Sequence, residues 1–221
     1  MPRKSRIIVP GLPHHVTQRG NRKTETFRED QDRTFFLCLL RDYSQQYDVK
    51  VDSYCLMDNH FHLISRPPSK LDHCRMMHDL NGHYAGYFNA RYEMTGHLWQ
   101  ARYYSCPMDE DHCWNTLRYV IQNPVRARLV DDPSKYRWSS AAYHLGISKD
   151  RLVSGAFSPG RLTSEDKEWL RTPLEAEELD RIRSATAKGI PYGSPAFIQG
   201  LEQALGVELR SRQRGRKPRR R

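Results

Sequence analysis

Apolar and polar residues alternate along several short stretches of the chain, and this two-residue period is typical of β-strands. Strands are therefore expected over 14–18, 49–54, 60–65 and 96–105. Residues 57–59, Met-Asp-Asn, are suited to a turn. The second and third strands are accordingly expected to pair as a hairpin.

In other segments apolar residues recur every three or four positions, which indicates helices. Helices are expected over 29–47, 70–92, 109–123 and 138–145. Ser69 is placed to cap the second helix and Pro124 to end the third. The second helix carries His73, His78 and His83, which are expected on its solvent-facing side. The order strand, helix, hairpin, helix, strand, helix predicts an α+β fold, with a ferredoxin-like antiparallel sheet flanked by helices.

Beyond residue 148 the pattern weakens, and the chain is expected to have three parts. Residues 1–148 are expected to form a folded domain, residues 149–209 a mostly helical C-terminal extension, and residues 210–221 a basic flexible tail. Within the extension, an acidic amphipathic helix is expected over 164–182 and a short helix over 197–205.

Charge points to a polyanionic partner. The formal net charge is +10 at pH 7, and the last twelve residues alone contribute eight lysines and arginines. Such a basic balance favours nucleic acid as the partner, although a solvated tail that only aids solubility fits equally well. No apolar stretch is long enough to span a bilayer, and the N-terminus lacks a secretory signal. The five cysteines form no Cys-x-x-Cys motif, so a reduced cytoplasmic protein is expected, with no membrane association.

Two histidines one residue apart, His60 and His62, lie in the third expected strand. On a strand, positions i and i+2 share a face about 6.6 Å apart, so the two imidazoles could converge on one metal ion. On a helix they would lie about 200° apart and could not. Phe61 between them is expected on the opposite, buried face. The alternative is a pair of solvated imidazoles.

The helix expected over 109–123 offers groups that could complete such a site. Tyr119 and Asn123 stand at i and i+4 and therefore share a face one turn apart. The Asn123 carbonyl oxygen could bind a metal, with the Tyr119 phenol beside it. The same spacing fits an alternative equally well, in which Tyr119 is a core residue with its hydroxyl at the rim and Asn123 merely ends the helix.

Four sequence blocks together resemble the single-tyrosine HUH transposases. They are His60-Phe61-His62 after Met-Asp-Asn, the stretch 118–127 (Arg-Tyr-Val-Ile-Gln-Asn-Pro-Val-Arg-Ala), and the stretches 14–21 and 96–103. More closely, they are similar to the REP-associated tyrosine transposases, relatives of the IS200/IS605-like elements. The resemblance covers residues 6–146 in the family's order and spacing. Asp58 departs from the pattern, because a proline is usual in that turn, and this bears on turn rigidity.

The resemblance implies a metal-dependent endonuclease and strand transferase, a transposase acting on single-stranded DNA folded into REP-type hairpins. Tyr119 would be the nucleophile and would form a 5′-phosphotyrosine, with residues 1–148 as the catalytic domain. His60 and His62 would be metal ligands, and Asn123 the third. The implied protein is cytoplasmic, nucleoid-associated and a monomer, with a dimer left open. Two rivals remain, a catalytically silent hairpin-binding regulator of DNA or RNA and a metal-dependent hydrolase without a covalent step.

The chemistry of the residues is compatible with this implication. A free phenol has a pKa of about 10 and is a weak nucleophile at neutral pH. A divalent ion on the phosphate withdraws charge and stabilises the leaving oxygen. Imidazole ligands favour Mn²⁺, whereas phosphate and water oxygens could complete a shell for Mg²⁺, so both ions are expected as cofactors.

The expected DNA-binding residues lie on loops and strand ends that could line one groove. They are Arg19, Asn21, Arg22, Lys23, Arg102, Tyr103, Arg126 and Arg128. The ring of Tyr103 could stack on an unpaired base, although an aromatic residue on a strand is also typical of a core. In the tail, Arg214 and Arg216 belong to an AT-hook-like Arg-Gly-Arg segment suited to a narrow minor groove.

Overall fold

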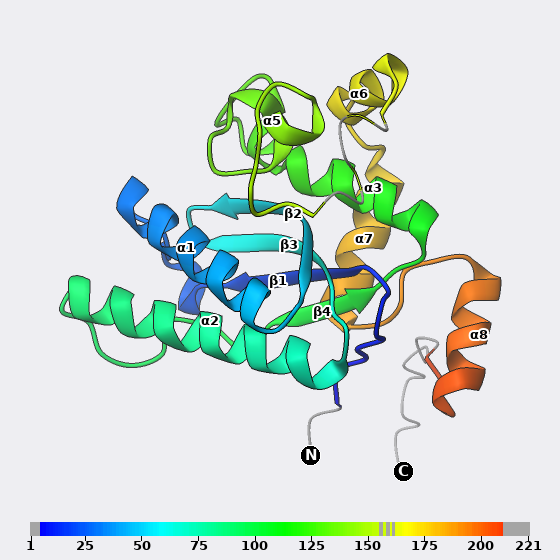
Figure 1. Cartoon of the computed structure of the whole chain (residues 1–221), viewed down its shortest axis with the longest axis horizontal. Coiled ribbons are helices and arrows are strands. Elements are labelled where there is room, and N and C mark those ends of the chain that lie inside the picture. The colour runs from blue at the N-terminus through cyan, green and yellow to red at the C-terminus, as the bar shows by residue number, and fades with distance from the viewer. Residues whose placement is uncertain (1–4, 155–156, 158–159, 161, 210–221) are drawn as a thin grey trace, which may run out of the picture.

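The fold is built on one four-stranded antiparallel sheet (Figure 1). The computed structural model describes residues 5–154, 157, 160 and 162–209. The strands are β1 (His14–Arg19), β2 (Lys50–Met57), β3 (His60–Arg66) and β4 (Tyr104–Pro107), in the spatial order β2-β3-β1-β4. β2 and β3 form the expected hairpin, with Asp58 and Asn59 as its turn. The predicted ferredoxin-like α+β fold is confirmed.

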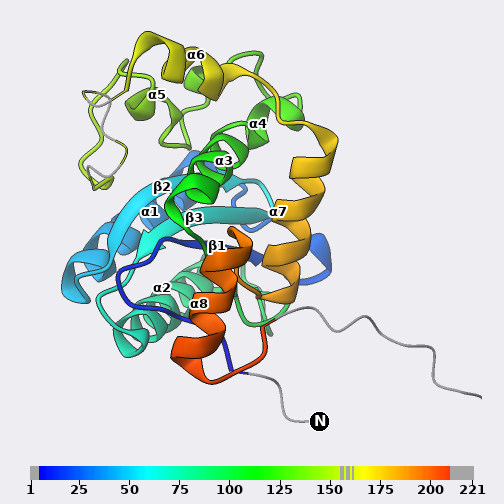
Figure 2. The ribbon, with the colours of Figure 1, turned by 90° about the vertical axis from the view of Figure 1, so that its right-hand side faces the viewer.

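Helices cover both faces of the sheet (Figures 1 and 2). On one face lie α1 (Asp30–Gln46) and α2 (Lys70–Arg91), and on the other α3 (Glu110–Ile121) and α7 (Ala176–Lys188). The remaining helices are α4 (Asn123–Arg126), α5 (Ala141–His144), α6 (Ser164–Arg171) and α8 (Pro195–Leu205), with short 3₁₀ turns at Asn21–Lys23 and Pro133–Lys135. No helix in the described part of the chain is long and apolar enough to cross a membrane.

The face under α1 and α2 is a packed apolar core. Phe61 from β3 contacts Phe36 from α1 with ring centroids 4.8 Å apart, and Phe36 in turn meets Phe27 and Tyr84 at 5.2 and 5.1 Å. All four side chains are at most 1% exposed. The alternation of β3 produces this core, because every second residue of the strand points to α1 and α2.

The prediction of a strand over 96–105 is wrong for most of that segment. Only β4, beginning at Tyr104, pairs in the sheet, and before it a single bridge joins Trp99 to Gly20. Gly96 has a φ of 89°, a left-handed conformation that breaks an extended run. The indole nitrogen of Trp99 donates to the carbonyl oxygen of Asn81 on α2, so this segment folds onto the helix instead of lengthening the strand.

Two expected helices are also corrected. The helix expected over 164–182 is two helices, α6 and α7, because Thr172 has extended angles (φ −74°, ψ 141°) immediately before Pro173. The helix expected over 109–123 ends at Ile121, and Pro124 occupies the first turn of α4, where a missing N–H costs nothing. Ser69 caps α2 as expected, its hydroxyl accepting from the backbone N–H of Asp72.

His73 of α2 does not face solvent as expected. Its side chain is buried against β1, with its ring 5.7 Å from that of His14, and it shares a hydrogen bond with the Ser65 hydroxyl at 3.2 Å. The helical pattern predicts which residues of α2 share a face. It does not show that a polar residue on that face is buried, because this depends on the partners that the fold brings to it.

Candidate active site

His60 and His62 project from β3 on the face opposite Phe61, towards α3 and α7. Their ring centroids are 5.0 Å apart and the ring planes are nearly perpendicular, at 83°. His62 is only 5% exposed, and His60 is partly exposed near the end of the hairpin. The strand geometry therefore places both imidazoles at one position, as the two-residue spacing requires.

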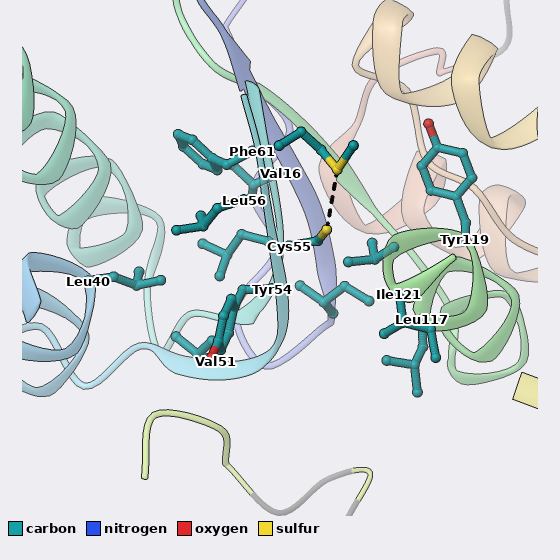
Figure 3. Packing of buried hydrophobic residues seen from close by; sticks show 14 of the residues in the cluster. Val16, Leu40, Val51, Tyr54, Cys55, Leu56, Phe61, Leu117, Tyr119 and Ile121 are labelled. Carbon is teal, nitrogen blue, oxygen red and sulfur yellow. Dashed lines mark hydrogen bonds between the residues drawn. The ribbon is translucent and has the colours of Figure 1, made fainter. Parts of the chain in front are cut away.

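Tyr119 approaches the same position from α3. Its ring lies edge-on to that of His62, with centroids 5.4 Å apart, and edge-on to that of His15 at 5.7 Å. In Figure 3, Phe61 and Leu56 point to the α1 side of the sheet, whereas Tyr119 stands on α3 on the other side. The residues expected to be metal ligand and nucleophile are thus neighbours, although 57 positions separate them in the sequence.

Arg126 covers the tyrosine. Its guanidinium carbon lies 4.5 Å from the centre of the Tyr119 ring, and Nη2 donates to the Tyr119 carbonyl oxygen at 2.8 Å. The second terminal nitrogen, Nη1, is buried and finds no hydrogen-bond partner in the part of the chain that the structure describes. An unsatisfied buried cationic nitrogen is costly to a fold, and here it lies beside the phenol ring.

Asn123 is held by its own helix end. Its amide nitrogen donates to the carbonyl oxygens of Tyr119 and Val120, at 3.1 and 3.2 Å, and its carbonyl oxygen accepts from Nη2 of Arg126 at 2.7 Å. The resemblance implies this oxygen as a third metal ligand, which stays a prediction. In the structure the oxygen accepts a hydrogen bond from a guanidinium.

His15 of β1 belongs to this cluster and was not among the residues expected there. A hydrogen bond of 2.9 Å joins its Nε2 to Nδ1 of His62, and one of 2.8 Å joins its Nδ1 to the hydroxyl of Thr186 on α7. The alternation of β1 was a usable signal, because it places His15 and Thr17 on one face. The register that pairs Thr17 with His62 cannot be obtained from the sequence pattern.

All three histidines are neutral at pH 7. Burial lowers the pKa of His15 to about 3, and burial together with the charge of Arg19 lowers the pKa of His60 to about 4. Burial, followed by the neighbouring His60 and His15, lowers the pKa of His62 well below its ordinary value. Neutral imidazoles keep a lone pair for a metal ion, and Arg19 and Arg126 make the surroundings attractive to a phosphate.

The histidine pair fits a metal ion in its donor atoms. Nε2 of His62 is buried and has no hydrogen-bond partner among the described residues, and Nδ1 of His60 is engaged by the side-chain oxygen of Asn59 at 2.7 Å. Within the described residues, no group of three or more histidine, cysteine, aspartate or glutamate side chains could hold a metal. Two nitrogen ligands are thus available, and the other ligands would have to be oxygens of Asn123, water or substrate.

A basic loop borders the site beyond β1. Arg19, Asn21, Arg22 and Lys23 are all exposed. The loop is fixed to the hairpin turn, since the N–H of Gly20 donates to the carbonyl oxygen of Asn59 at 2.9 Å. Only glycine fits at position 20, because a Cβ there would lie 2.3 Å from the carbonyl oxygen of Thr24.

The remaining expected DNA contacts fall into three groups. Arg102 and Arg128 are exposed, as a DNA contact requires. Tyr103 is 8% exposed, with Arg6 over one face of its ring at 3.7 Å, which is typical of a core residue; its stacking on a base stays a prediction. Arg214 and Arg216 lie outside the described residues.

Comparison with known proteins identifies a family and similar folds. The model of a family described as "Transposase IS200 like" matches residues 9–123. Among solved structures, that of a REP-associated tyrosine transposase bound to a REP hairpin covers 74% of this chain and 100% of its own, with a TM-score of 0.55 and 13% identity. A protein from Deinococcus radiodurans described as a transposase covers 54% of this chain and 95% of its own, with a TM-score of 0.38 and 18% identity. No curated protein matches the sequence.

Proposed function

Because the chain belongs to the IS200-like transposase family, we propose that it cleaves and rejoins single-stranded DNA folded into REP-type hairpins, using a divalent metal and a covalent tyrosine intermediate. The observation that carries this proposal is the meeting of two side chains from separate elements. The free, buried Nε2 of His62 and the ring of Tyr119 share one position, with ring centroids 5.4 Å apart.

In this proposal Tyr119 is the nucleophile. Its phenol oxygen forms a bond to the scissile phosphorus, and the bond from phosphorus to the 3′ oxygen breaks. The products are a 5′-phosphotyrosine on the protein and a strand ending in a 3′-OH, with the phenol proton passing to water and the 3′ oxygen taking one up. The reverse step with the 3′-OH of another strand is strand transfer, and it needs no nucleotide triphosphate because the phosphotyrosine retains the bond energy.

His60 and His62 would hold the metal through their Nε2 atoms. A bound Mg²⁺ or Mn²⁺ supplies charge that stabilises the phosphate oxygens as they develop negative charge. The histidines and their strand would contribute in two ways. The two neutral imidazoles leave the ion's charge undiminished, and the β-strand holds them rigidly at one position.

Arg126 and Asn123 have different proposed roles, the first in binding phosphate and the second in binding the metal. With Nη2 on the Asn123 oxygen and Nη1 unpartnered, Arg126 is placed to bind a phosphate oxygen beside Tyr119. Asn123 becomes the proposed third ligand when the guanidinium turns to that phosphate, because an oxygen that faces a cationic guanidinium is disfavoured as a ligand for a second cation. Substrate and metal would then complete the site together.

The basic loop is the proposed contact for the hairpin. Arg19, Arg22 and Lys23 are exposed at the edge of the site, and Arg102 and Arg128 add charge on further loops. The relative with the same fold is bound to a REP hairpin, and a single strand folded into a hairpin offers both phosphates and unpaired bases. The extension after residue 148 and the tail of 210–221 are proposed to add to this surface.

A second candidate is favoured by one observation. The hydrogen bond from Arg126 engages the Asn123 oxygen, so the described residues leave the histidine pair without its expected third protein ligand. A chain with this arrangement locked in place would bind hairpins and cleave nothing. It would act as a regulator rather than an enzyme.

The test is adduct formation on labelled single-stranded hairpins with Mn²⁺, read as a covalent protein–DNA band under denaturing conditions. We expect the wild type and the control Tyr104→Phe, which changes an exposed tyrosine, to form the adduct. Tyr119→Phe should bind the hairpin equally well and form none. An adduct with Tyr119→Phe would refute the assigned nucleophile, full activity in excess EDTA would refute the metal, and tight binding without any wild-type adduct would favour the regulator.

A further inference from the structure

We propose that His15 and Thr186 are positioning residues, which fix the tautomer of His62 so that its Nε2 lone pair faces the metal position. The inference rests on the proposed function only in taking His62 as a metal ligand. It assigns a role to α7 in the C-terminal extension, 171 residues from His15 along the chain.

The direction of the hydrogen bonds begins at Thr186. Its hydroxyl lies 2.8 Å from the carbonyl oxygen of Ile182, one turn earlier in α7, and 2.8 Å from Nδ1 of His15. A hydroxyl has one proton, and a carbonyl oxygen can only accept. If the proton pointed to His15, two bare oxygens would face each other at 2.8 Å. The hydroxyl therefore donates to Ile182 and accepts from His15.

The same constraint extends through both imidazole rings. His15 donates from Nδ1, and in a neutral imidazole the other nitrogen, Nε2, then accepts. That nitrogen lies 2.9 Å from Nδ1 of His62, so His62 must carry its proton on Nδ1. Its Nε2 consequently holds the lone pair, and this is the buried atom for which the described residues provide no hydrogen-bond partner. With the opposite tautomer, two lone pairs would face each other between the rings and Nε2 could not bind a metal.

A shorter chain of hydrogen bonds fixes His60 in the same way. The amide nitrogen of Asn59 donates to the carbonyl oxygen of Lys23 at 3.2 Å, so the amide oxygen is the atom that faces His60. Nδ1 of His60 donates to that oxygen at 2.7 Å and leaves Nε2 with the lone pair. His60 is thus oriented by its own hairpin turn, whereas His62 depends on β1 and α7. Partners of this kind orient metal-binding histidines and tune their affinity.

The first test uses the wild-type protein without metal. Two-dimensional ¹⁵N NMR on histidine-labelled protein near neutral pH distinguishes a protonated from an unprotonated ring nitrogen, and the His62 signals are identified with a His62→Asn variant. We expect the proton of His62 on Nδ1 and that of His15 on Nδ1. A proton on Nε2 of His62 would overturn the inference, and no activity measurement is involved.

The second test removes the acceptor. Thr186→Val keeps the shape but loses the hydroxyl, so His62 should show both tautomers and the affinity for Mn²⁺ alone should fall at least about tenfold. Thr186→Ser, which keeps the hydroxyl, should restore the single tautomer of His62 and the wild-type affinity for Mn²⁺. Thr116→Val is the matched control, because Thr116 is also buried and also donates to a carbonyl one turn earlier, that of His112, but reaches no histidine side chain.

The outcomes separate this inference from the proposed function. An unchanged tautomer and unchanged Mn²⁺ affinity in Thr186→Val would overturn the positioning role, even if the DNA adduct forms. The expected tautomer and Mn²⁺ effects in a protein that makes no adduct would support the positioning role and leave the proposed function refuted. If Thr186→Val does not fold, the tautomer of His62 in the wild-type protein still decides the question.

Discussion

The two faces of the central sheet put the same strands to different uses. Towards α1 and α2, Phe61 packs among aromatic rings that are at most 1% exposed. Towards α3 and α7, the residues on either side of it, His60 and His62, meet a tyrosine and a third histidine. At this point of β3, one face presents an apolar ring that needs no hydrogen-bond partner, and the other presents imidazoles that each require one.

The two faces differ in how they affect the stability of the fold. On the α1/α2 face, burial of apolar area stabilises the fold by roughly 25 cal/mol per Å². On the α3/α7 face, Nε2 of His62 and Nη1 of Arg126 are buried without hydrogen-bond partners within the described part of the chain. Each such group costs about 1–3 kcal/mol. The proposed function accounts for this cost, because a bound ion and a bound phosphate would satisfy those atoms.

The largest expected effect on stability comes from Phe61→Ala. Removing a fully buried aromatic side chain leaves a cavity, and the free energy of unfolding should fall by about 3–5 kcal/mol. Urea unfolding followed by circular dichroism measures this change. A loss of less than about 1 kcal/mol would mean that the α1/α2 face is not the main core, whereas the protein that remains folded should still form the DNA adduct.

The substitution of the neighbouring residue, His60→Ala, should have the opposite effects: a large loss of activity and a small loss of stability. Removing one metal-binding imidazole should lower adduct formation at least about a hundredfold, equivalent to about 2.7 kcal/mol in the barrier, with little rescue by excess Mn²⁺. Its free energy of unfolding should change by less than about 1 kcal/mol, since the side chain is only partly buried. His62→Ala should lose as much activity but also some stability, because it deprives His15 of its partner. Retained activity in either variant would contradict the metal role.

Acid should weaken the α1/α2 face through His14 and His73. Burial lowers the pKa of His14 to about 4 and that of His73 to about 3, below the value of about 6.5 in an unfolded chain. The unfolded state therefore binds more protons below pH 6.5, and the stability present above that pH is lost as the pH falls towards the folded pKa values. Each histidine contributes up to about 1.4 kcal/mol per pH unit. Urea unfolding of His73→Gln between pH 7 and about 4 should show a smaller pH dependence than the wild type, and an equal dependence would contradict the prediction.

The smallest effect is expected in the basic loop. Lys23 has a φ of 63°, a left-handed conformation that costs a non-glycine residue about 1–2 kcal/mol. Lys23→Gly should raise the free energy of unfolding by up to about 1 kcal/mol, and the loss of one phosphate contact should reduce the salt dependence of hairpin binding by about one unit. Lys23→Ala is the control, since it should reduce the salt dependence without raising stability. Equal stability of the two variants would show that the backbone there is not strained.

The sequence alone determined the features that depend on local spacing. The two-residue period placed His60 and His62 on one face and Phe61 on the other, and the turn residues 57–59 made a hairpin of β2 and β3. The order and spacing of the motifs that resemble the transposase family also identified Tyr119 as the candidate nucleophile. The inferences about faces succeeded because strand geometry fixes the face of each residue without regard to what packs on it.

Only the tertiary structure decided which groups meet across that face. His15 bonds to His62 because of the β1–β3 register, and Thr186 reaches His15 because α7 lies on the sheet. The Asn123 oxygen faces Arg126 rather than an open site, and Pro173 divides the helix expected over 164–182. Periodicity reports the face of a residue but not its partner, and a hydrogen bond between residues far apart in the chain exists only once the packing of whole elements has placed both atoms.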